Sequence, residues 1–351
     1  MTDTIRAGVV GFGLGGRIFH AAVISAVPGL ELAAIVQRTG DAASKAYPHV
    51  KLCRSIDEML ADESIRLIAI SSPTPLHVEH AEQCLRANRD VVIDKPFALT
   101  SDEATRLIRL ARERGRLLTA YQNRRWDGDF KTVEKILVSG LLGRLVTFES
   151  HFDRYKTEPR RQAWKESGGP GGGTLFDLGT HLIDQALTLF GKPERIFASV
   201  RTERDNGVTD DAFDVTLFYP RLTAYLRSTN VAKAAGARFT LHGTQGSFVK
   251  YGLDPQEAAL VGGAGFDAPG FGHEPEEAWG KLHIDGAAPQ SVETEAGDYR
   301  GLYANVRDAL LGKAKLAITP EQAWRTTRLI ELARESSSEG RVLPVDFSNE
   351  P

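Results

Sequence analysis

Short hydrophobic runs alternate with helix-like stretches over the first third of the chain. Runs rich in Val, Ile, Leu and Ala predict buried strands at residues 7–10, 32–36, 67–70, 91–93 and 117–120. The spacing of apolar positions between them predicts helices at residues 17–25, 55–60, 76–87 and 101–114. For the last helix, Thr100 or Ser101 with Glu103 gives a start signal and Gly115 a stop signal. This alternation predicts an α/β domain with a doubly wound parallel sheet covered on both faces.

The pattern changes after residue 121. A helix near residues 130–139 is followed by strands predicted at residues 145–152, 195–201, 213–219, 223–228, 238–242 and 247–251. Several of these strands are joined by very short turns, which suit antiparallel hairpins. Residues 252–282 are predicted to form a loop rich in Gly and Pro, and residues 320–336 an amphipathic closing helix. The chain therefore divides into an α/β domain over residues 1–121 and an α+β domain with an open, mostly antiparallel sheet over residues 122–351.

Composition and charge exclude several classes of protein. With 42% hydrophobic and 25% charged residues, the chain is neither disordered, collagen-like nor a coiled coil as a whole. A net charge of -3 gives no electrostatic reason to bind nucleic acid or an anionic membrane surface. Apolar runs stay well below the roughly 18 residues of a membrane span, and the N-terminus lacks a signal-peptide pattern. Cys53 and Cys84 predict buried thiols, so we expect a cytoplasmic protein.

Glycine is over-represented, with 34 residues where a background of roughly 7% predicts about 25. Residues 11–16, GFGLGG, match G-x-G-x-x-G between a predicted strand and a predicted helix, as a dinucleotide-binding fingerprint requires. Gly11 allows the tight turn, Gly13 allows a pyrophosphate to approach the backbone, and Gly16 allows close helix–strand packing. We therefore expect the first domain to be a Rossmann-type dinucleotide-binding domain. The alternative is a glycine turn without a ligand.

The end of the second predicted strand bears on the choice of dinucleotide. NAD sites usually place Asp or Glu there to accept hydrogen bonds from the ribose hydroxyls. This chain has Gln37, Arg38 and Thr39 instead. Arg38 can pair with a 2′-phosphate through two hydrogen bonds, which favours NADP over NAD. If Arg38 stacks on the adenine instead, both cofactors are accepted.

Residues 91–96, VVIDKP, place Asp94 and Lys95 at the carboxyl end of a buried strand. This is the edge at which open α/β sheets bind ligands. Lys95 beside a cofactor can donate a hydrogen bond to a substrate hydroxyl or lower its pKa. The alternative is a surface ion pair between the two side chains.

A second glycine run, residues 168–173, precedes Asp177 and His181. These two residues are four positions apart, so on a helix they share one face. A carboxylate beside an imidazole orients the ring and supports its protonated form, as general acid–base catalysis requires. No Cys or second nearby His completes a metal-binding set, so no metal is expected. Taken alone, His181 is also compatible with an ordinary packed helix face.

The order of the three motifs resembles the glucose–fructose oxidoreductase / inositol dehydrogenase (Gfo/Idh/MocA) family over nearly the whole chain. Asp94 stands where family members commonly have Glu. Segments at residues 121–130, 154–155, 162–165, 178–185 and 248–252 resemble the branch that contains bacterial NADP-dependent scyllo-inositol dehydrogenases. In that branch the second strand also ends without an acidic residue and carries an arginine, in agreement with Arg38.

The resemblance implies a dehydrogenase that transfers hydride between a CH–OH group of a cyclic polyol, such as inositol, and NADP. It implies Lys95, Asp177 and His181 as catalytic residues, and a nicotinamide near Pro73, His77 and Lys95. The implied cofactor contacts are Gly11, Phe12, Gly13, Leu14, Gly16, Arg38, Thr39, Ser72, Pro73, His77, Asp94, Lys95 and Asn123. The implied substrate contacts are Lys95, Tyr155, Trp164, Asp177 and His181. For Asn123, Tyr155 and Trp164, packing around the domain junction is the alternative.

Family members pair their open sheets face to face, so the resemblance also implies a homodimer or homotetramer through the C-terminal sheet. Three other functions remain open at this stage. They are an aldose or sugar dehydrogenase of the same family, a glycosidase that keeps NAD bound, and a non-enzymatic NADP-sensing protein. The glycines of residues 262–272 have no assigned role.

Overall fold

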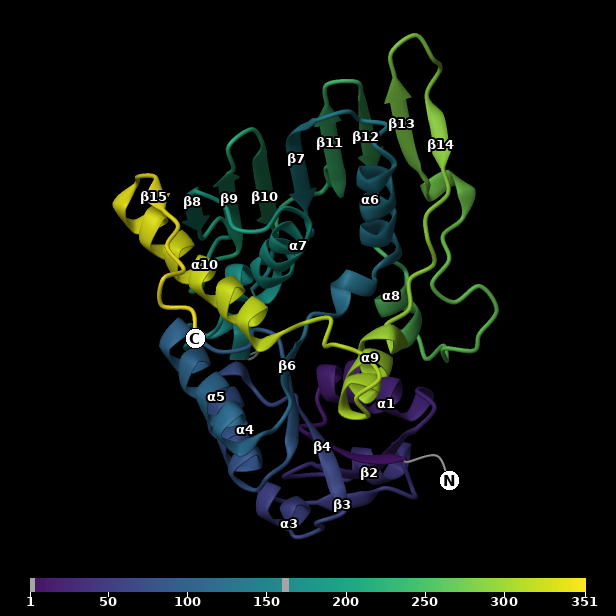
Figure 1. Ribbon diagram of the computed structural model, residues 1–351, viewed down its shortest axis with the longest axis vertical. Helices are drawn as coiled ribbons and strands as arrows, with labels where there is room; N and C mark the ends of the chain where they lie inside the picture. The colour runs from purple at the N-terminus through teal and green to yellow at the C-terminus, as the bar shows by residue number, and fades with distance from the viewer. Residues whose placement is uncertain (1–3, 160–163) are drawn as a thin grey trace. The chain divides into compact units, whose positions relative to one another are not determined.

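The computed structural model describes residues 4–159 and 164–351 (Figure 1). Two compact units make up the chain. The first comprises Met1–Asn123, Tyr299–Thr327 and Glu350–Pro351, and the second comprises Arg124–Asp298 and Arg328–Asn349. Within the described ranges, no helix is long and apolar enough to cross a membrane.

A six-stranded sheet in the order β3-β2-β1-β4-β5-β6 forms the centre of the first unit. Its strands are β1 (Ile5–Val10), β2 (Leu30–Val36), β3 (Lys51–Cys53), β4 (Ile65–Ile70), β5 (Asp90–Asp94) and β6 (Leu118–Tyr121). All neighbours pair in parallel, which confirms the predicted doubly wound sheet. The pattern missed the edge strand β3, because three residues are too few to show a hydrophobic period. The strand order reverses between β1 and β4, and at this point such sheets bind ligands beyond the carboxyl ends of their strands.

Helices cover both faces of this sheet. Figure 1 shows α4 (His77–Arg86) and α5 (Ser101–Arg114) on one side, and α1 (Ala22–Ala26) with α9 (Arg300–Leu310) on the other. The predicted bounds of α5 are confirmed: Thr100 and Glu103 form a capping box, and Gly115 ends the helix with a φ of 60°. The remaining helices, α2 (Ala42–Ala46) and α3 (Ile56–Leu60), are short.

Helix α9 belongs to the first unit, whereas the sequence pattern placed every residue after 121 in the second domain. The physical reason is the buried face of α9, formed by Leu302, Tyr303 and Val306, since this helix packs against α1. Contacts between segments almost 300 residues apart leave no periodic signal in the sequence.

The second unit is built on a nine-stranded sheet in the order β14-β13-β12-β11-β7-β10-β9-β8-β15. Its strands are β7 (Leu145–His151), β8 (Arg195–Arg201), β9 (Ala212–Phe218), β10 (Thr223–Thr229), β11 (Phe239–Gly243), β12 (Gly246–Lys250), β13 (Gly280–Ile284), β14 (Gln290–Val292) and β15 (Leu343–Pro344). Only β7 and β10 pair in parallel among these neighbours of the described chain. The predicted open, mostly antiparallel sheet is thereby confirmed.

One face of this sheet supplies the core of the second unit. Phe148, Leu226 and Leu241 are fully buried and come from three adjacent strands. The helices of this unit are α6 (Gly128–Ser139), α7 (Thr180–Phe190), α8 (Gln256–Val261) and part of α10 (Pro320–Glu339), and α7 packs on β10. The prediction of a loop over residues 252–282 is wrong in part, because α8 and the start of β13 lie within it. Six helical residues are too few to show a 3.6-residue period.

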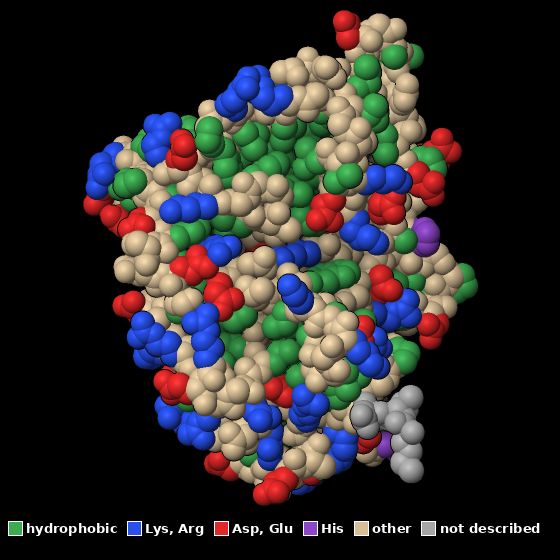
Figure 2. All heavy atoms as spheres, in the orientation of Figure 1, with side chains coloured by type: hydrophobic (Ala, Val, Ile, Leu, Met, Phe, Trp, Pro, Cys, Tyr) green, Lys and Arg blue, Asp and Glu red, His purple; other side chains and the backbone are tan. Residues whose placement is uncertain are grey.

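The mixed charge of the surface and the burial of the two thiols agree with what the composition predicts. Lys and Arg side chains are interspersed with Asp and Glu over the face shown in Figure 2. Cys53 and Cys84 are free and buried, as predicted, and burial raises the pKa of Cys84 to about 12. In the described part of the chain, no group of three or more His, Cys, Asp and Glu side chains is arranged to hold a metal ion.

Candidate functional site

The glycine loop after β1 has a shape that fits a dinucleotide. Gly11 has a φ of 98°, and a Cβ atom there would lie 2.6 Å from the Ser71 carbonyl oxygen. A Cβ atom on Gly16 would lie 1.9 Å from the Gly11 oxygen, whereas one on Gly13 would meet no atom within 4 Å. The first and third glycines are therefore required by the packing of the chain itself. The middle glycine leaves its backbone open, which suits the approach of a pyrophosphate.

The loop after β2 presents Arg38 and Thr39 to solvent. Behind them, Arg54 Nη1 donates hydrogen bonds to the carbonyl oxygens of Gln37 (3.0 Å) and Gly40 (2.5 Å). Sequence reasoning missed Arg54, because it follows the unpredicted strand β3. In the first glycine loop, Leu14 is exposed. Phe12 packs edge-on against Tyr47 there, with ring centroids 6.1 Å apart.

His77 connects the turn after β4 to the turn after β5. Its ring is buried, with Nδ1 2.8 Å from the Pro96 oxygen and Nε2 2.8 Å from the Ser72 oxygen. Burial lowers the pKa of His77 below its ordinary value, although the nearby Asp94 carboxylate opposes this shift. Pro73 is exposed beside this ring, and Asn123 is buried at the end of β6. The turns after β4 and β5 therefore meet at the edge of the sheet at which β6 also ends.

Asp94 anchors the turn that carries Lys95. Its Oδ1 accepts a hydrogen bond from the Lys95 backbone N–H (2.8 Å), and its Oδ2 accepts one from Ser71 Oγ (3.1 Å). Oδ2 also lies 2.8 Å from the position of a Cβ atom on Gly15, so the carboxylate touches the glycine loop. Burial raises the pKa of Asp94, but His20, Lys95 and His77 together lower it further, to well below its usual range. The Lys95 turn and the glycine loop thus share one ionised carboxylate.

In the second unit, Asp177 and His181 occupy consecutive helical turns. Asp177 lies in the π-helical turn η5 (Leu175–Gly179), and His181 is buried in the first turn of α7. The Asp177 carboxylate accepts hydrogen bonds from Lys165 Nζ (2.5 Å) and Arg154 Nη1 (3.3 Å). Sequence reasoning expected Asp177 to orient His181 or to bind a neighbouring substrate hydroxyl, and it missed both cations as partners of Asp177. Arg154 lies outside the helices and strands and Lys165 lies in a three-residue helix, so no periodic pattern relates either residue to η5.

The second glycine run serves the packing of the chain. At Gly172 and Gly173, other parts of the chain come close to the glycine backbone. A Cβ atom on Gly173, which has a φ of 93°, would lie 2.2 Å from Asp210 Oδ1. The other oxygen of Asp210 accepts a hydrogen bond from the Leu175 N–H (2.7 Å) and so caps the start of η5. Gly173 therefore helps to position Asp177.

The two predicted aromatic substrate contacts have different surroundings. Trp164 begins the short helix η4 (Trp164–Glu166), and Lys165 Nζ lies 5.7 Å from the centroid of its ring. Trp164 is therefore near the Lys165–Asp177 pair. Tyr155 is exposed and forms an isolated β-bridge with Val231. Residues 162 and 163, which contribute to the family resemblance, lie outside the described residues.

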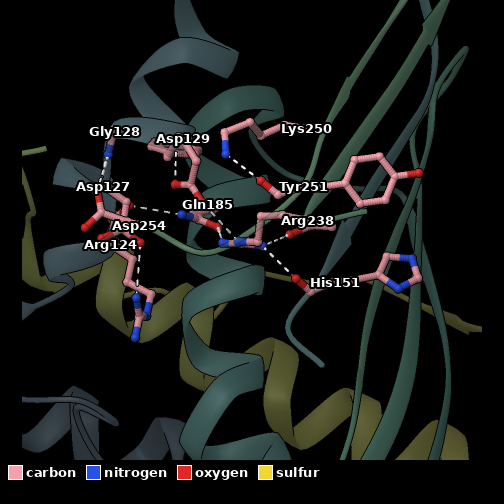
Figure 3. A network of polar contacts seen from close by, with 12 residues as sticks. Arg124, Asp127, Gly128, Asp129, His151, Gln185, Arg238, Lys250, Tyr251 and Asp254 are labelled. Carbon is pink, nitrogen blue, oxygen red and sulfur yellow. Dashed lines mark hydrogen bonds and ion pairs between the residues drawn. The ribbon is translucent and has the colours of Figure 1, made fainter. Parts of the chain in front are cut away.

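A buried polar network holds α7 in place (Figure 3). Gln185 of α7 donates a hydrogen bond to the Arg124 carbonyl oxygen and accepts one from Arg238 Nη2, both at 3.0 Å. The Arg238 guanidinium lies 3.3 Å from Asp129 Oδ2, and Asp254 accepts a hydrogen bond from the Gly128 N–H (2.7 Å). These contacts fix the helix that carries His181. They join segments far apart in the chain, so the sequence pattern could not show them.

The geometry agrees with what comparisons with known proteins find. The family model described as "Oxidoreductase family, NAD-binding Rossmann fold" matches residues 5–122, and the one described as "Oxidoreductase family, C-terminal alpha/beta domain" matches residues 135–347. A Bacillus subtilis protein named scyllo-inositol 2-dehydrogenase (NADP(+)) IolW is 35% identical, over 98% of this chain and 97% of that protein. The Escherichia coli protein named uncharacterized oxidoreductase YdgJ is 38% identical, over 98% and 99%. A solved putative oxidoreductase, YvaA of Bacillus subtilis, superimposes with a TM-score of 0.94 at 35% identity, over 99% of each chain.

Proposed function

Because the chain belongs to the Gfo/Idh/MocA family of oxidoreductases, we propose that it is an NADP-dependent dehydrogenase for a secondary hydroxyl of a cyclic polyol. The turn after β5 carries the proposal, since Asp94 holds Lys95 beside the glycine loop. An ammonium group placed there can reach the oxygen of a substrate that lies against the cofactor. The name of the B. subtilis relative supports the inositol class of substrate.

The residues at the sheet edge fit the cofactor. Gly11, Gly13 and Gly16 shape the pyrophosphate loop, and the exposed Arg38 is available to a 2′-phosphate without an acidic neighbour. The other proposed contacts are Phe12, Leu14, Thr39, Ser72, Pro73, His77, Asp94, Lys95 and Asn123. When bound, the nicotinamide supplies the acceptor for a hydride.

The proposed catalytic residues Lys95, Asp177 and His181 have separate roles in the reaction. Lys95 donates a hydrogen bond to the hydroxyl oxygen, and His181 takes the hydroxyl proton while the carbon loses its hydride and becomes a carbonyl. Asp177, held by Arg154 and Lys165, binds a neighbouring hydroxyl or supports His181. Tyr155 and Trp164 provide further contacts to the polyol ring.

A spectrophotometric screen tests this proposal. Inositol isomers and aldoses are offered with NADP and with NAD, and reduction of the nicotinamide is followed by its absorbance. We expect turnover with an inositol and NADP. Turnover only with aldoses would make the protein a sugar dehydrogenase. NAD retained through purification together with release of a free sugar would make it a glycosidase, and NADP binding without any turnover would make it a sensor.

We also propose that the protein assembles as a homodimer or homotetramer through the open face of the nine-stranded sheet. Phe197, Phe218 and Tyr225 belong to adjacent strands and alternate with buried core positions, so they lie on the face opposite the core. Aromatic side chains on an uncovered sheet face are typical of a protein interface.

A further inference from the structure

A chain of buried polar groups lies behind Lys95 in the first unit. The Tyr303 hydroxyl of α9 is 2.7 Å from His20 Nδ1, and His20 Nε2 is 3.5 Å from Asp94 Oδ2. Asp94 in turn accepts the hydrogen bond of the Lys95 backbone N–H. Tyr303 and His20 are both completely buried. Three segments far apart in the sequence therefore form one chain of contacts that ends at the backbone of Lys95.

The chemistry of these groups selects one tautomer of His20. Burial raises the pKa of Tyr303 well above its ordinary value, so its hydroxyl keeps its proton and can donate it to Nδ1. An imidazole that accepts at Nδ1 carries its own proton at Nε2, and this N–H faces the Asp94 carboxylate. The other tautomer would direct a lone pair at a negative charge. A distance of 3.5 Å is longer than a normal hydrogen bond, and at this distance an N–H at Nε2 directs its dipole at the carboxylate.

Packing keeps the ring of His20 in this orientation. The ring of Tyr121 lies 4.4 Å from it, centroid to centroid, and the rings of Tyr121 and Tyr303 are 5.7 Å apart. The titratable groups that face the pair are Tyr121, Asp94 and His77, and Lys95 acts on Asp94 from its other side. A change in the tautomer of His20 therefore changes which group, an N–H or a lone pair, faces the Asp94 carboxylate.

We infer that Tyr303 and His20 are positioning residues for Lys95. Tyr303 fixes the tautomer of His20 whose N–H faces Asp94, and Asp94 then holds both the Lys95 backbone and the glycine loop. The effect on kcat rests on the proposed dehydrogenase function, whereas the tautomer of His20 does not. The tautomer and the effect on kcat are therefore measured separately.

The first experiment reads the tautomer by ¹⁵N NMR of the full-length protein labelled at histidine. The signals of His20 are identified by their loss in His20→Asn. We expect a single Nε2–H tautomer in the wild type and a mixture of tautomers in Tyr303→Phe. An Nδ1–H tautomer in the wild type, or an unchanged spectrum in Tyr303→Phe, would overturn the inference. The result holds whether or not a substrate has been found.

The second experiment measures kcat and KM with the substrate identified by the screen. We expect Tyr303→Phe and His20→Asn to lower kcat by about 10- to 100-fold, the range for groups that orient a functional side chain. We expect KM for NADP to rise as well, by a smaller factor than kcat falls, because Asp94 also touches the glycine loop. The matched control is Tyr299→Phe, since this buried hydroxyl precedes α9 and its ring packs on Phe19. We expect Tyr299→Phe to keep the wild-type kcat.

A double-variant cycle separates positioning from general destabilisation. If Tyr303 acts through Asp94, then Tyr303→Phe introduced into Asp94→Asn causes little further loss of kcat. Independent effects would multiply instead. The inference would be contradicted if the losses of kcat multiply in the double variant, or if Tyr299→Phe loses as much kcat as Tyr303→Phe. A wild-type kcat in Tyr303→Phe would contradict it too. Thermal unfolding of every variant shows whether a loss of kcat merely follows a loss of fold.

Discussion

At the scale of single residues, the carboxylates nearest the proposed chemistry are held by specific partners. Asp94 is bound by Ser71 and by the Lys95 backbone, and Asp177 by Arg154 and Lys165. Each carboxylate therefore has a fixed orientation. Side chains held in this way can act without a large rearrangement.

The first residue-scale prediction concerns Lys95 and His181. We expect Lys95→Ala and His181→Ala each to lower turnover by at least about 100-fold, the lower limit for loss of a group that transfers or stabilises a proton. Circular dichroism and thermal unfolding should show both variants folded. Near-normal turnover in either variant would remove that residue from the mechanism.

The choice of cofactor depends on Arg38. We expect Arg38→Ala to weaken NADP binding by about tenfold or more, because a hydrogen bond to a charged group contributes roughly 1.5–3 kcal/mol. NAD lacks the 2′-phosphate, so its affinity should change little. Arg54→Ala is the control, since Arg54 holds the loop through carbonyl oxygens and its loss should weaken both cofactors alike. Fluorescence titration of the wild type and both variants measures the affinities for NADP and NAD, and equal losses in Arg38→Ala would contradict the 2′-phosphate contact.

The raised pKa of Asp254 predicts how the free energy of unfolding depends on pH. Burial and the charge of Asp129 raise the pKa of Asp254 to about 6. A carboxyl with a raised pKa binds its proton more tightly in the folded state, so its contribution is present below about pH 4 and is lost as the pH rises through about 6. The loss is on the order of 2–3 kcal/mol.

Urea unfolding between about pH 4 and 7.5 tests this prediction. Asp254→Asn cannot ionise, so its stability relative to the wild type should rise across this window. Asp308 has a pKa lowered by Arg307 and is the control: it is ionised in the folded and unfolded states above about pH 5, so Asp308→Asn should shift stability equally across that range. Parallel curves for the wild type and Asp254→Asn would show that Asp254 titrates normally.

At the scale of elements, the turn before η5 depends on a glycine that only tertiary contacts explain. Gly173 has a φ of 93° and lies against Asp210, whose carboxylate caps the segment that carries Asp177. Arg334 of α10 binds the same carboxylate at 3.0 Å. The element thus depends on residues far along the chain.

We expect Gly173→Ala to lower the free energy of unfolding by about 1–3 kcal/mol, through backbone strain and the clash with Asp210. It should also lower turnover, since Asp177 is displaced. Gly140→Ala is the matched control, because Gly140 has a φ of 71° but open space around it, and it should cost only the backbone strain. Equal stability losses in the two variants, by urea unfolding, would mean that Asp210 adjusts freely.

At the scale of the whole molecule, the second unit buries one face of its sheet and leaves the other available. Tyr225 lies in β10, next to Thr216 of β9 and Glu149 of β7, near the middle of the strand order. This open face is the surface on which we propose that a second copy assembles. Two of the glycines of residues 262–272 have a local role: Gly262 ends α8, and Gly272 lies against Gly297.

We expect light scattering after size exclusion to give a dimer or tetramer for the wild type. Tyr225→Glu should shift it toward the monomer, because a buried interface does not accommodate an unpaired charge. Val138→Glu, on a fully exposed site of α6, is the control and should leave the assembly unchanged. A monomeric wild type would contradict assembly through this sheet.

The sequence by itself determined the two kinds of sheet, most element positions, and the glycine, Asp94–Lys95 and Asp177–His181 motifs. It could do so because periodicity, helix caps and the fingerprint are local: each depends on residues within one or two turns of the chain. Elements that are too short to show a hydrophobic period, such as β3 and α8, were not predicted for the same reason.

Only the tertiary structure decided that α9 joins the first unit, that Tyr303 and His20 lie behind Asp94, and that Lys165 and Arg154 bind Asp177. These contacts join residues that are distant in the chain. Whether two such residues meet depends on the path of the whole backbone and on which apolar faces it buries together. No pattern in a single stretch of sequence encodes that choice.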